Sequence, residues 1–146
     1  MLDMLPDFDV SNGVRQIDPS RPEAGEMSIC FDRRERIIRV TAYGYFSPEY
    51  SDRQFRELKA ANEAMRARFG IARVLIDKCN SPPQSQATCE RIEIGTRLAF
   101  QAGDRAALLV NNSLTKMQMR RVVDVSTHQL FLSEQAAIMW LKANDR

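Results

Sequence analysis

Residues 36–50 read RIIRVTAYGYFSPEY, and this stretch joins a strand directly to a helix. β-Branched side chains and alternation over residues 36–43 predict a strand with one core-facing side. Residues 47–49, Ser-Pro-Glu, predict a helix start, because serine caps free amides, proline suits the first turn and glutamate meets the positive end of the helix dipole. A strand that leads into a helix is typical of an α/β domain. The residues on the core-facing side are Ile38, Val40 and Ala42.

The sequence on either side of this stretch extends the pattern. Residues 28–31 alternate as a short strand and residues 32–35 form a polar turn, which predicts an antiparallel hairpin. Apolar residues at helical spacing continue the helix to Phe69, and Gly70 ends it. Residues 72–77 then predict a third strand.

The rest of the chain alternates helices with strands. We expect helices over residues 84–102, 114–125 and from 133 onward, and strands at residues 106–110 and 128–132. Gly95 lies inside the first of these helices, where glycine costs about 1 kcal/mol relative to alanine. The predicted fold is a small α/β domain with a mixed, mostly parallel five-stranded sheet, an antiparallel N-terminal hairpin strand and four helices.

Residues 1–26 are interpreted as an irregular N-terminal extension, and residues 27–146 as the domain. Prolines and glycines interrupt the extension, yet it carries too many large apolar residues for a simple tail. If helices cover chiefly one sheet face, the other face is partly apolar and needs cover. We expect residues 1–26 to pack across that second face or across a second subunit. The second face would carry Ile37, Arg39, Thr41, Arg73 and Leu75.

The composition is that of an ordinary globular domain, with 146 residues, 44% of them apolar and 27% charged. Acidic residues interrupt the N-terminal apolar positions where a secretory signal would lie, and no apolar run is long enough to span a bilayer. We therefore expect a cytoplasmic protein. A net charge of +2 is too small to indicate a nucleic-acid partner.

The sequence carries no motif for phosphate binding, hydrolysis or metal binding. Its cysteines, Cys30, Cys79 and Cys89, form no CxxC pair, and its single histidine, His128, falls in a predicted strand. We therefore expect free thiols, a structural histidine, no metal, no cofactor and no catalysis.

One polar cluster stands out at the carboxyl edge of the predicted sheet, where open α/β sheets bind ligands. Such side chains can form a ligand or partner site, or they can simply cap helices and satisfy turns. Both interpretations stay open. The cluster consists of Asp77, Cys79, Asn80, Ser81, Asn111, Asn112 and Ser113.

The helix expected over residues 114–125 forms a second candidate surface. Lys116, Arg120 and Arg121 make it basic, and Met117 and Met119 lie between them. Such a helix can contact an acidic partner or an anionic lipid surface. The alternative is a solvated face above a methionine-packed core.

Three segments resemble the SpoIIAA-like branch of the STAS superfamily: residues 36–50, the strand at residues 73–77, and the ending at residues 131–141. The resemblance implies a small α/β domain that binds partners, or in some members apolar ligands or membranes, rather than an enzyme. Anti-sigma antagonists of this superfamily carry a phosphorylated serine after the third strand. The nearest counterpart is Ser81, but residues 77–83 read DKCNSPP and depart from that motif.

From these features we expect a non-catalytic regulatory or partner-binding module that forms a homodimer. The alternative is a carrier of a small apolar or lipid-like ligand, with peripheral membrane contact. The first reading depends on the predicted layout and the lack of a catalytic constellation; the second depends on the methionine and aromatic content.

Overall fold

The strands of the sheet follow one another across it in the same order as along the chain. The computed structural model describes residues 2–8 and 25–143, and five strands lie within them. The antiparallel pair is β1 (Glu26–Asp32) with β2 (Ile37–Tyr43), and the parallel strands that follow are β3 (Arg73–Asn80), β4 (Arg105–Leu109) and β5 (His128–Phe131). The predicted mixed sheet is confirmed.

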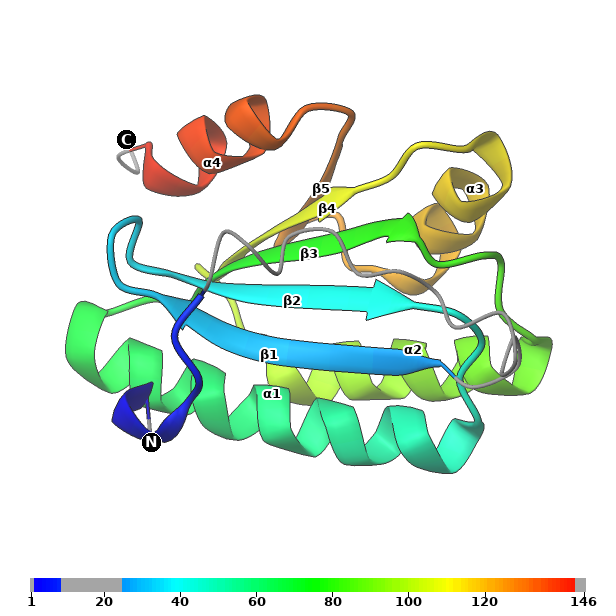
Figure 1. Cartoon of the computed structure of the whole chain (residues 1–146), viewed down its shortest axis with the longest axis horizontal. Helices are drawn as coiled ribbons and strands as arrows, with labels where there is room; N and C mark the ends of the chain where they lie inside the picture. Colours follow the sequence, from blue (N-terminus) through cyan, green and yellow to red (C-terminus); the bar gives the residue numbers. More distant parts are fainter. Residues whose placement is uncertain (1, 9–24, 144–146) are drawn as a thin grey trace.

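The crossovers determine which face each helix covers. The three helices between parallel strands are α1 (Pro48–Phe69), α2 (Gln86–Ala99) and α3 (Ser113–Val122). Each crossover steps to the next strand in the same direction, so a common right hand places all three on one face. No strand follows α4 (Glu134–Lys142) in the described residues, and α4 lies on the opposite face (Figure 1).

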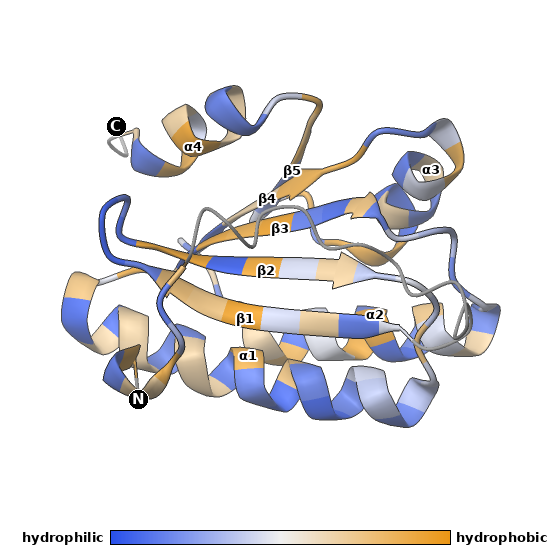
Figure 2. Cartoon of the chain, viewed as in Figure 1, coloured by the Kyte–Doolittle hydropathy of each residue, from blue (hydrophilic) through white to orange (hydrophobic). Residues whose placement is uncertain are grey.

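The larger core lies between the sheet and α1, α2 and α3. It includes Ile38 and Val40 of β2, as predicted, together with Leu58 and Met65 of α1 and Met119 of α3. Apolar residues run along the strands, whereas the turn between β1 and β2 is hydrophilic (Figure 2). Burial of this continuous apolar face is the main force that holds the helices on the sheet.

Helix α1 begins and ends where the sequence predicts. The Ser47 hydroxyl accepts a hydrogen bond from the Tyr50 amide at 3.1 Å, and Pro48 occupies the first turn. At the other end, Gly70 has a φ of 93° and donates its amide to the Arg66 carbonyl at 2.8 Å. A side chain at position 70 would be strained in this conformation.

Most strands begin or end within one or two residues of the predicted bounds, and larger differences occur in β3, α2 and α3. β3 extends to Asn80, which pairs with Tyr43 past a bulge that places one extra residue in β3. α2 begins after Ser85, which caps it, and ends at Ala99, so it is shorter than the predicted range 84–102. α3 ends at Val122 rather than near residue 125. Gln84, which was predicted to begin this helix, lies before the Ser85 cap and takes part in a loop network described below.

Gly95 has a packing role in the middle of α2. A Cβ atom at this position would overlap the ring of Phe55, because α1 and α2 cross closely there. The glycine therefore gives up helix propensity in exchange for close contact between two helices.

The second sheet face is covered by α4 rather than left open. Ala137 and Leu141 of α4 pack on Ile37 of β2, Leu75 of β3 and Ala107 of β4 in a separate, smaller core. Two arginines of the sheet cap the end of α4, because the side chain of Arg73 donates to the Leu141 carbonyl at 2.7 Å and that of Arg105 to the Trp140 carbonyl at 2.8 Å. The helices were expected to cover chiefly one face of the sheet. Among the described helices this is correct for α1, α2 and α3 but not for α4.

The described part of the N-terminal extension lies against the domain. Leu2 is buried in the larger core, and Pro6 and Phe8 form backbone hydrogen bonds with Phe31 at the outer edge of β1. The ring of Phe8 lies 4.0 Å from the Arg39 guanidinium on the second sheet face. Residues 9–24 lie outside the described residues, so the prediction for the rest of the extension stays a prediction.

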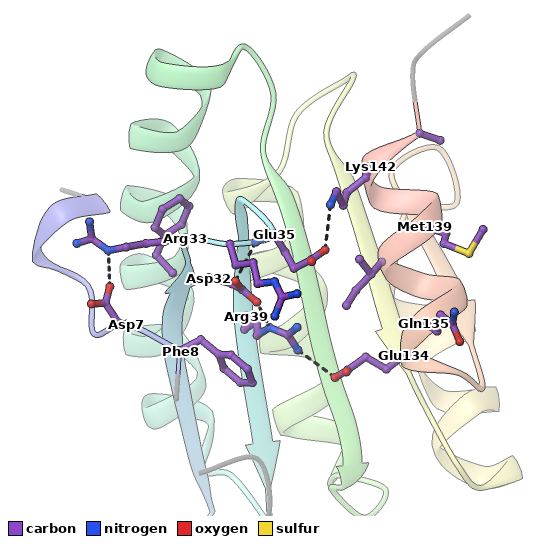
Figure 3. Close-up of a pocket in the computed structure, with 14 residues that line it drawn as sticks. Asp7, Phe8, Asp32, Arg33, Glu35, Arg39, Glu134, Gln135, Met139 and Lys142 are labelled. Carbon is purple, nitrogen blue, oxygen red and sulfur yellow. Dashed lines mark hydrogen bonds and ion pairs between the residues drawn. The ribbon is translucent and has the colours of Figure 1, made fainter. Parts of the chain in front are cut away.

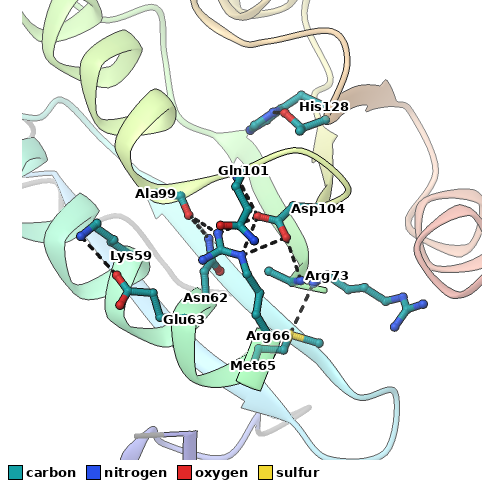
Figure 4. A network of polar contacts seen from close by, with 12 residues as sticks. Lys59, Asn62, Glu63, Met65, Arg66, Arg73, Ala99, Gln101, Asp104 and His128 are labelled. Carbon is teal, nitrogen blue, oxygen red and sulfur yellow. Dashed lines mark hydrogen bonds and ion pairs between the residues drawn. The ribbon is translucent and has the colours of Figure 1, made fainter. Parts of the chain in front are cut away.

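A buried polar network ties α1 to the loop before β4 (Figure 4). Asp104 accepts hydrogen bonds from Arg66 Nη2 at 2.6 Å and from the backbone amides of Ala72 and Gln101 at 3.0 and 2.9 Å. Its side chain is 1% exposed, so the charge is compensated entirely inside the protein. Asn62 joins the network through the Ala99 carbonyl, at 2.9 Å.

Replacing Gly95→Ala should destabilise the protein by about 1–3 kcal/mol, because the added methyl group overlaps the Phe55 ring. Urea denaturation measures the loss. In a Phe55→Leu background the same replacement should cost clearly less. Equal costs in the two backgrounds would show that Phe55 is not the cause.

Replacing Asp104→Asn should destabilise the protein by about 3 kcal/mol, because the Arg66 charge loses its buried partner. A matched control is Glu63→Gln, which breaks an exposed pair with Lys59 on the same helix and should change stability by no more than about 0.5 kcal/mol. Similar losses in both variants would contradict the assigned role of the Asp104 network.

Candidate functional site

The predicted polar cluster lies at the carboxyl edge of the sheet, but the sheet divides it between two faces. Along β3, Asp77 and Cys79 alternate with Ile76 and Lys78, so Cys79 packs against the small core beneath α4. Asp77 accepts a hydrogen bond from the Cys79 amide at 2.9 Å. Burial, with Asp77 nearby, raises the pKa of the Cys79 thiol to about 11, so this thiol is a poor nucleophile.

The residues after β4 are exposed and cap α3. The Asn112 side chain accepts a hydrogen bond from the Thr115 amide at 2.8 Å, and its amide lies 3.5 Å from the side-chain oxygen of Asn111. Asn80, Asn111 and Ser113 are also exposed at this edge. The capping interpretation therefore accounts for Asn112, while the other exposed side chains remain available to a partner.

Gln84 is buried at the carboxyl edge and links the loops that follow β2 and β3. Its side-chain nitrogen donates to the carbonyls of Gly44 and Pro82, both at 2.9 Å, and to the Ser81 hydroxyl at 3.2 Å. Its side-chain oxygen accepts a hydrogen bond from the Phe46 amide at 2.8 Å. This role could not be predicted from the sequence, because a glutamine between two prolines and a helix start is typical of an ordinary loop.

Ser81 is only 2% exposed, and its hydroxyl and carbonyl are both hydrogen-bonded, to Gln84 and Thr115. A kinase could reach this hydroxyl only if the loop opened. Phosphorylation of Ser81 therefore stays a prediction that depends on such an opening.

The outer face of α3 forms an exposed apolar and basic surface. Leu114 and Met117 are 66% and 52% exposed, although the opposite side of the helix is buried through Thr115, Met119 and Val122. The helix carries no acidic residue. We name the outward-facing residues the α3 ridge, and they are Leu114, Lys116, Met117, Arg120 and Arg121.

The bases of the α3 ridge form no ion pair with any residue in the ranges 2–8 and 25–143. An apolar pair flanked by uncompensated cations is suited to an acidic surface with an apolar centre.

A groove of about 960 Å³ lies on the second sheet face, between α4 and the β1–β2 turn (Figure 3). On its floor, the buried Arg39 donates to Asp32 at 2.8 Å and to Glu134 at 3.0 Å. Lys142 and Glu35 form a second ion pair between α4 and the turn, at 3.1 Å. The charged groups of the groove are thus largely matched to one another, and these pairs attach α4 to the hairpin.

Lys78 is a buried lysine whose position in the core was not predicted from the sequence. It occupies a core-facing position of β3, in line with Val74 and Ile76, and is 4% exposed. Burial lowers the pKa of Lys78 to about 8. The alternation of β3 could have revealed it, because a charged residue two positions after Ile76 falls on the core face.

Within the described ranges, neither His128 nor any cluster of possible metal ligands forms a catalytic site. His128 is 6% exposed, packs edge-on against Phe100 and has a pKa lowered to about 4 by burial. No three His, Cys, Asp or Glu side chains of these ranges gather as metal ligands would. None of the described helices has the length and apolarity required to cross a membrane.

A five-stranded mixed sheet in sequential order, with three crossover helices on one face, defines the fold class. The chain is similar to the crystal structure of an uncharacterized protein from the DUF3478 family, with a SpoIIAA-like fold, from Shewanella loihica PV-4. The match covers 88% of this chain and 99% of that chain, with a TM-score of 0.57 and 16% sequence identity. The chain therefore has a SpoIIAA-like fold, as the resemblance predicted. No protein-family model and no curated protein matches the chain.

Replacing Lys78→Met should stabilise the protein at pH 7. The Lys78 ammonium is hydrated in the unfolded chain, and folding removes that hydration, which costs free energy. The pKa of Lys78 is lowered, so this cost is complete below about pH 8 and disappears as the pH rises to about 10.5. The difference between variant and wild type should shrink by about 3 kcal/mol over that interval. Urea denaturation at several pH values measures it, and a difference that does not depend on pH would contradict the assignment.

Proposed function

We propose that this protein is a non-catalytic partner-binding module whose contact surface is the α3 ridge. The observation that carries the proposal is the exposure of Leu114 and Met117 on a helix that has three bases and no acid. Large apolar side chains exposed side by side with cations are a feature of binding surfaces rather than of inert ones.

The chemistry of the ridge favours an acidic protein partner with an apolar pocket. Lys116, Arg120 and Arg121 would guide the encounter, and Leu114 and Met117 would provide the buried contact. Exposed Asn80, Asn111 and Ser113 at the neighbouring edge of the sheet would supply hydrogen bonds around it. In this proposal, loop opening and phosphorylation at Ser81 would act next to the contact surface, because Ser81 bonds to Thr115 of α3.

The carrier alternative has less support. The chamber between the sheet and its helices has a volume of about 30 Å³, which is room for about two water molecules and not for a lipid tail. A lipid tail would require α1 and α2 to separate from the sheet.

The double variant Leu114→Ser, Met117→Ser tests the proposal. We expect it to weaken binding to the partner by at least about tenfold, because apolar contacts at an interface centre commonly contribute more than 1 kcal/mol each. The partner is captured from a lysate of the source organism, purified, and titrated calorimetrically against both forms of the protein. A matched control is Leu98→Ser, which removes an equally exposed leucine, 63% exposed, from α2.

Two outcomes would overturn the proposal. Equal affinity of wild type and double variant would show that the partner binds elsewhere. Loss of binding to vesicles of phosphatidylglycerol and phosphatidylcholine, with no partner affected, would assign the ridge to a membrane surface. Native mass spectrometry of the same samples measures whether the module is a homodimer, as we also propose.

A further inference from the structure

The two edges of the sheet differ in how the rest of the chain covers them. At the β1 edge, the N-terminal segment pairs with Phe31, whose amide donates to the Pro6 carbonyl at 3.0 Å and whose carbonyl accepts the Phe8 amide at 3.2 Å. At the opposite edge, β5 pairs with β4 on one side, and no strand of the described residues lies on its other side. An uncovered strand edge is a template for pairing with another strand.

The hydrogen bonds to β4 show which backbone groups of β5 point outward. The carbonyls of Thr127 and Phe131 accept hydrogen bonds from amides in and just after β4, at 2.8 and 3.2 Å. Backbone groups alternate in direction along a strand, so those of His128, Leu130 and Leu132 point away from β4. In the part of the chain that the structure describes, no hydrogen bond reaches the His128 carbonyl, either backbone group of Leu130 or the Leu132 amide.

The side chains of this edge lack the groups that commonly protect an edge strand. Residues 128–132 read HQLFL, with no Asp, Glu, Lys, Arg or Pro among them. Leu132 is 82% exposed, and Val125, in the turn before β5, is 85% exposed. β5 has only four residues, so a strand paired with it would also depend on such apolar side chains.

A second copy of the same edge matches these groups. If a two-fold axis passes beside Leu130, its amide and carbonyl exchange hydrogen bonds with those of the partner's Leu130. The Leu132 amide then meets the partner's His128 carbonyl, and the symmetry repeats this bond. No like charges oppose one another in this register, because residues 128–132 carry no acidic or basic side chain apart from the histidine.

We propose that a second copy of this chain pairs antiparallel with the free edge of β5, so that the sheets of two protomers become continuous. This inference rests on the homodimer of the proposed function and assigns its interface. It uses no residue of the α3 ridge, so the two surfaces can be tested separately.

Amide hydrogen exchange, followed by NMR at several protein concentrations, tests the pairing residue by residue. In a monomer the amides of Leu130 and Leu132 face solvent, whereas the Phe131 amide faces β4. We expect the protection of the Leu130 and Leu132 amides to rise by at least about tenfold from the most dilute to the most concentrated sample, and that of Phe131 to change much less.

The variant Leu132→Lys tests the same contact through the dissociation constant of the dimer, measured by sedimentation equilibrium. Leu132 is exposed, so the fold should tolerate the change. We expect the dissociation constant to rise by at least about tenfold, because the symmetry brings two lysines to an apolar edge. The matched control, Met4→Lys, changes an equally exposed residue, 84% exposed, in the N-terminal segment and should leave the dimer unaffected.

Three outcomes would overturn the inference. A dimer that is equally stable in wild type and Leu132→Lys, with an unprotected Leu130 amide, would place the interface elsewhere and leave the homodimer itself in place. A wild type that is monomeric at every concentration would exclude the homodimer as well, without affecting the α3 ridge. Protection of Leu130 that appears only after a purified protein partner is added would assign the edge to a strand of that partner.

Discussion

The common hand of the crossovers is the constraint on which the rest of this structure depends. Strands that follow in sequential order force every crossover helix onto the same side of the sheet. That side becomes the large core, and the carboxyl ends of the strands all lead into the first turns of α1, α2 and α3. The proposed contact surface lies at this end, because α3 begins there. α4 lies outside the constraint and covers the face that the crossovers leave.

Buried polar groups, rather than a ligand, close the two ends of the large core. At the carboxyl edge, Gln84 links the loops after β2 and β3, and at the opposite end Asp104 links α1 to the start of β3 and the turn before β4. Both satisfy backbone groups that no strand or helix pairs. Each of the two side chains forms several hydrogen bonds to loop backbone at once. The conformation of the loops around it therefore depends on that one side chain.

The sequence predicted every strand and helix of the described domain, because hydrophobic periodicity and caps act locally. Ser47 and Gly70 marked the ends of α1 without any knowledge of the fold. Gly95 was expected to lower the stability of α2. The structure shows that a glycine is required there because Phe55 packs against it, and periodicity cannot reveal this tertiary contact. The candidate site was predicted less well. Asp77 and Cys79 fell at the expected edge, yet Lys78 between them faces the core, and the role of Gln84 depends on loops that only the folded chain brings together.

The attachment of α4 has a consequence for the motions of the protein. Among the described residues, the small core beneath α4 contains six buried residues and the larger core on the other face contains eighteen. Part of the remaining attachment of α4 is ionic, through Arg39–Glu134 and Lys142–Glu35. The half-exposed Lys142–Glu35 pair weakens as salt rises, whereas the Arg39–Glu134 pair, whose arginine is buried, is screened less and apolar burial is not screened. The two layers of this domain therefore respond to ionic strength unequally, and α4 becomes the part of the molecule that can detach while the sheet and its three crossover helices stay folded.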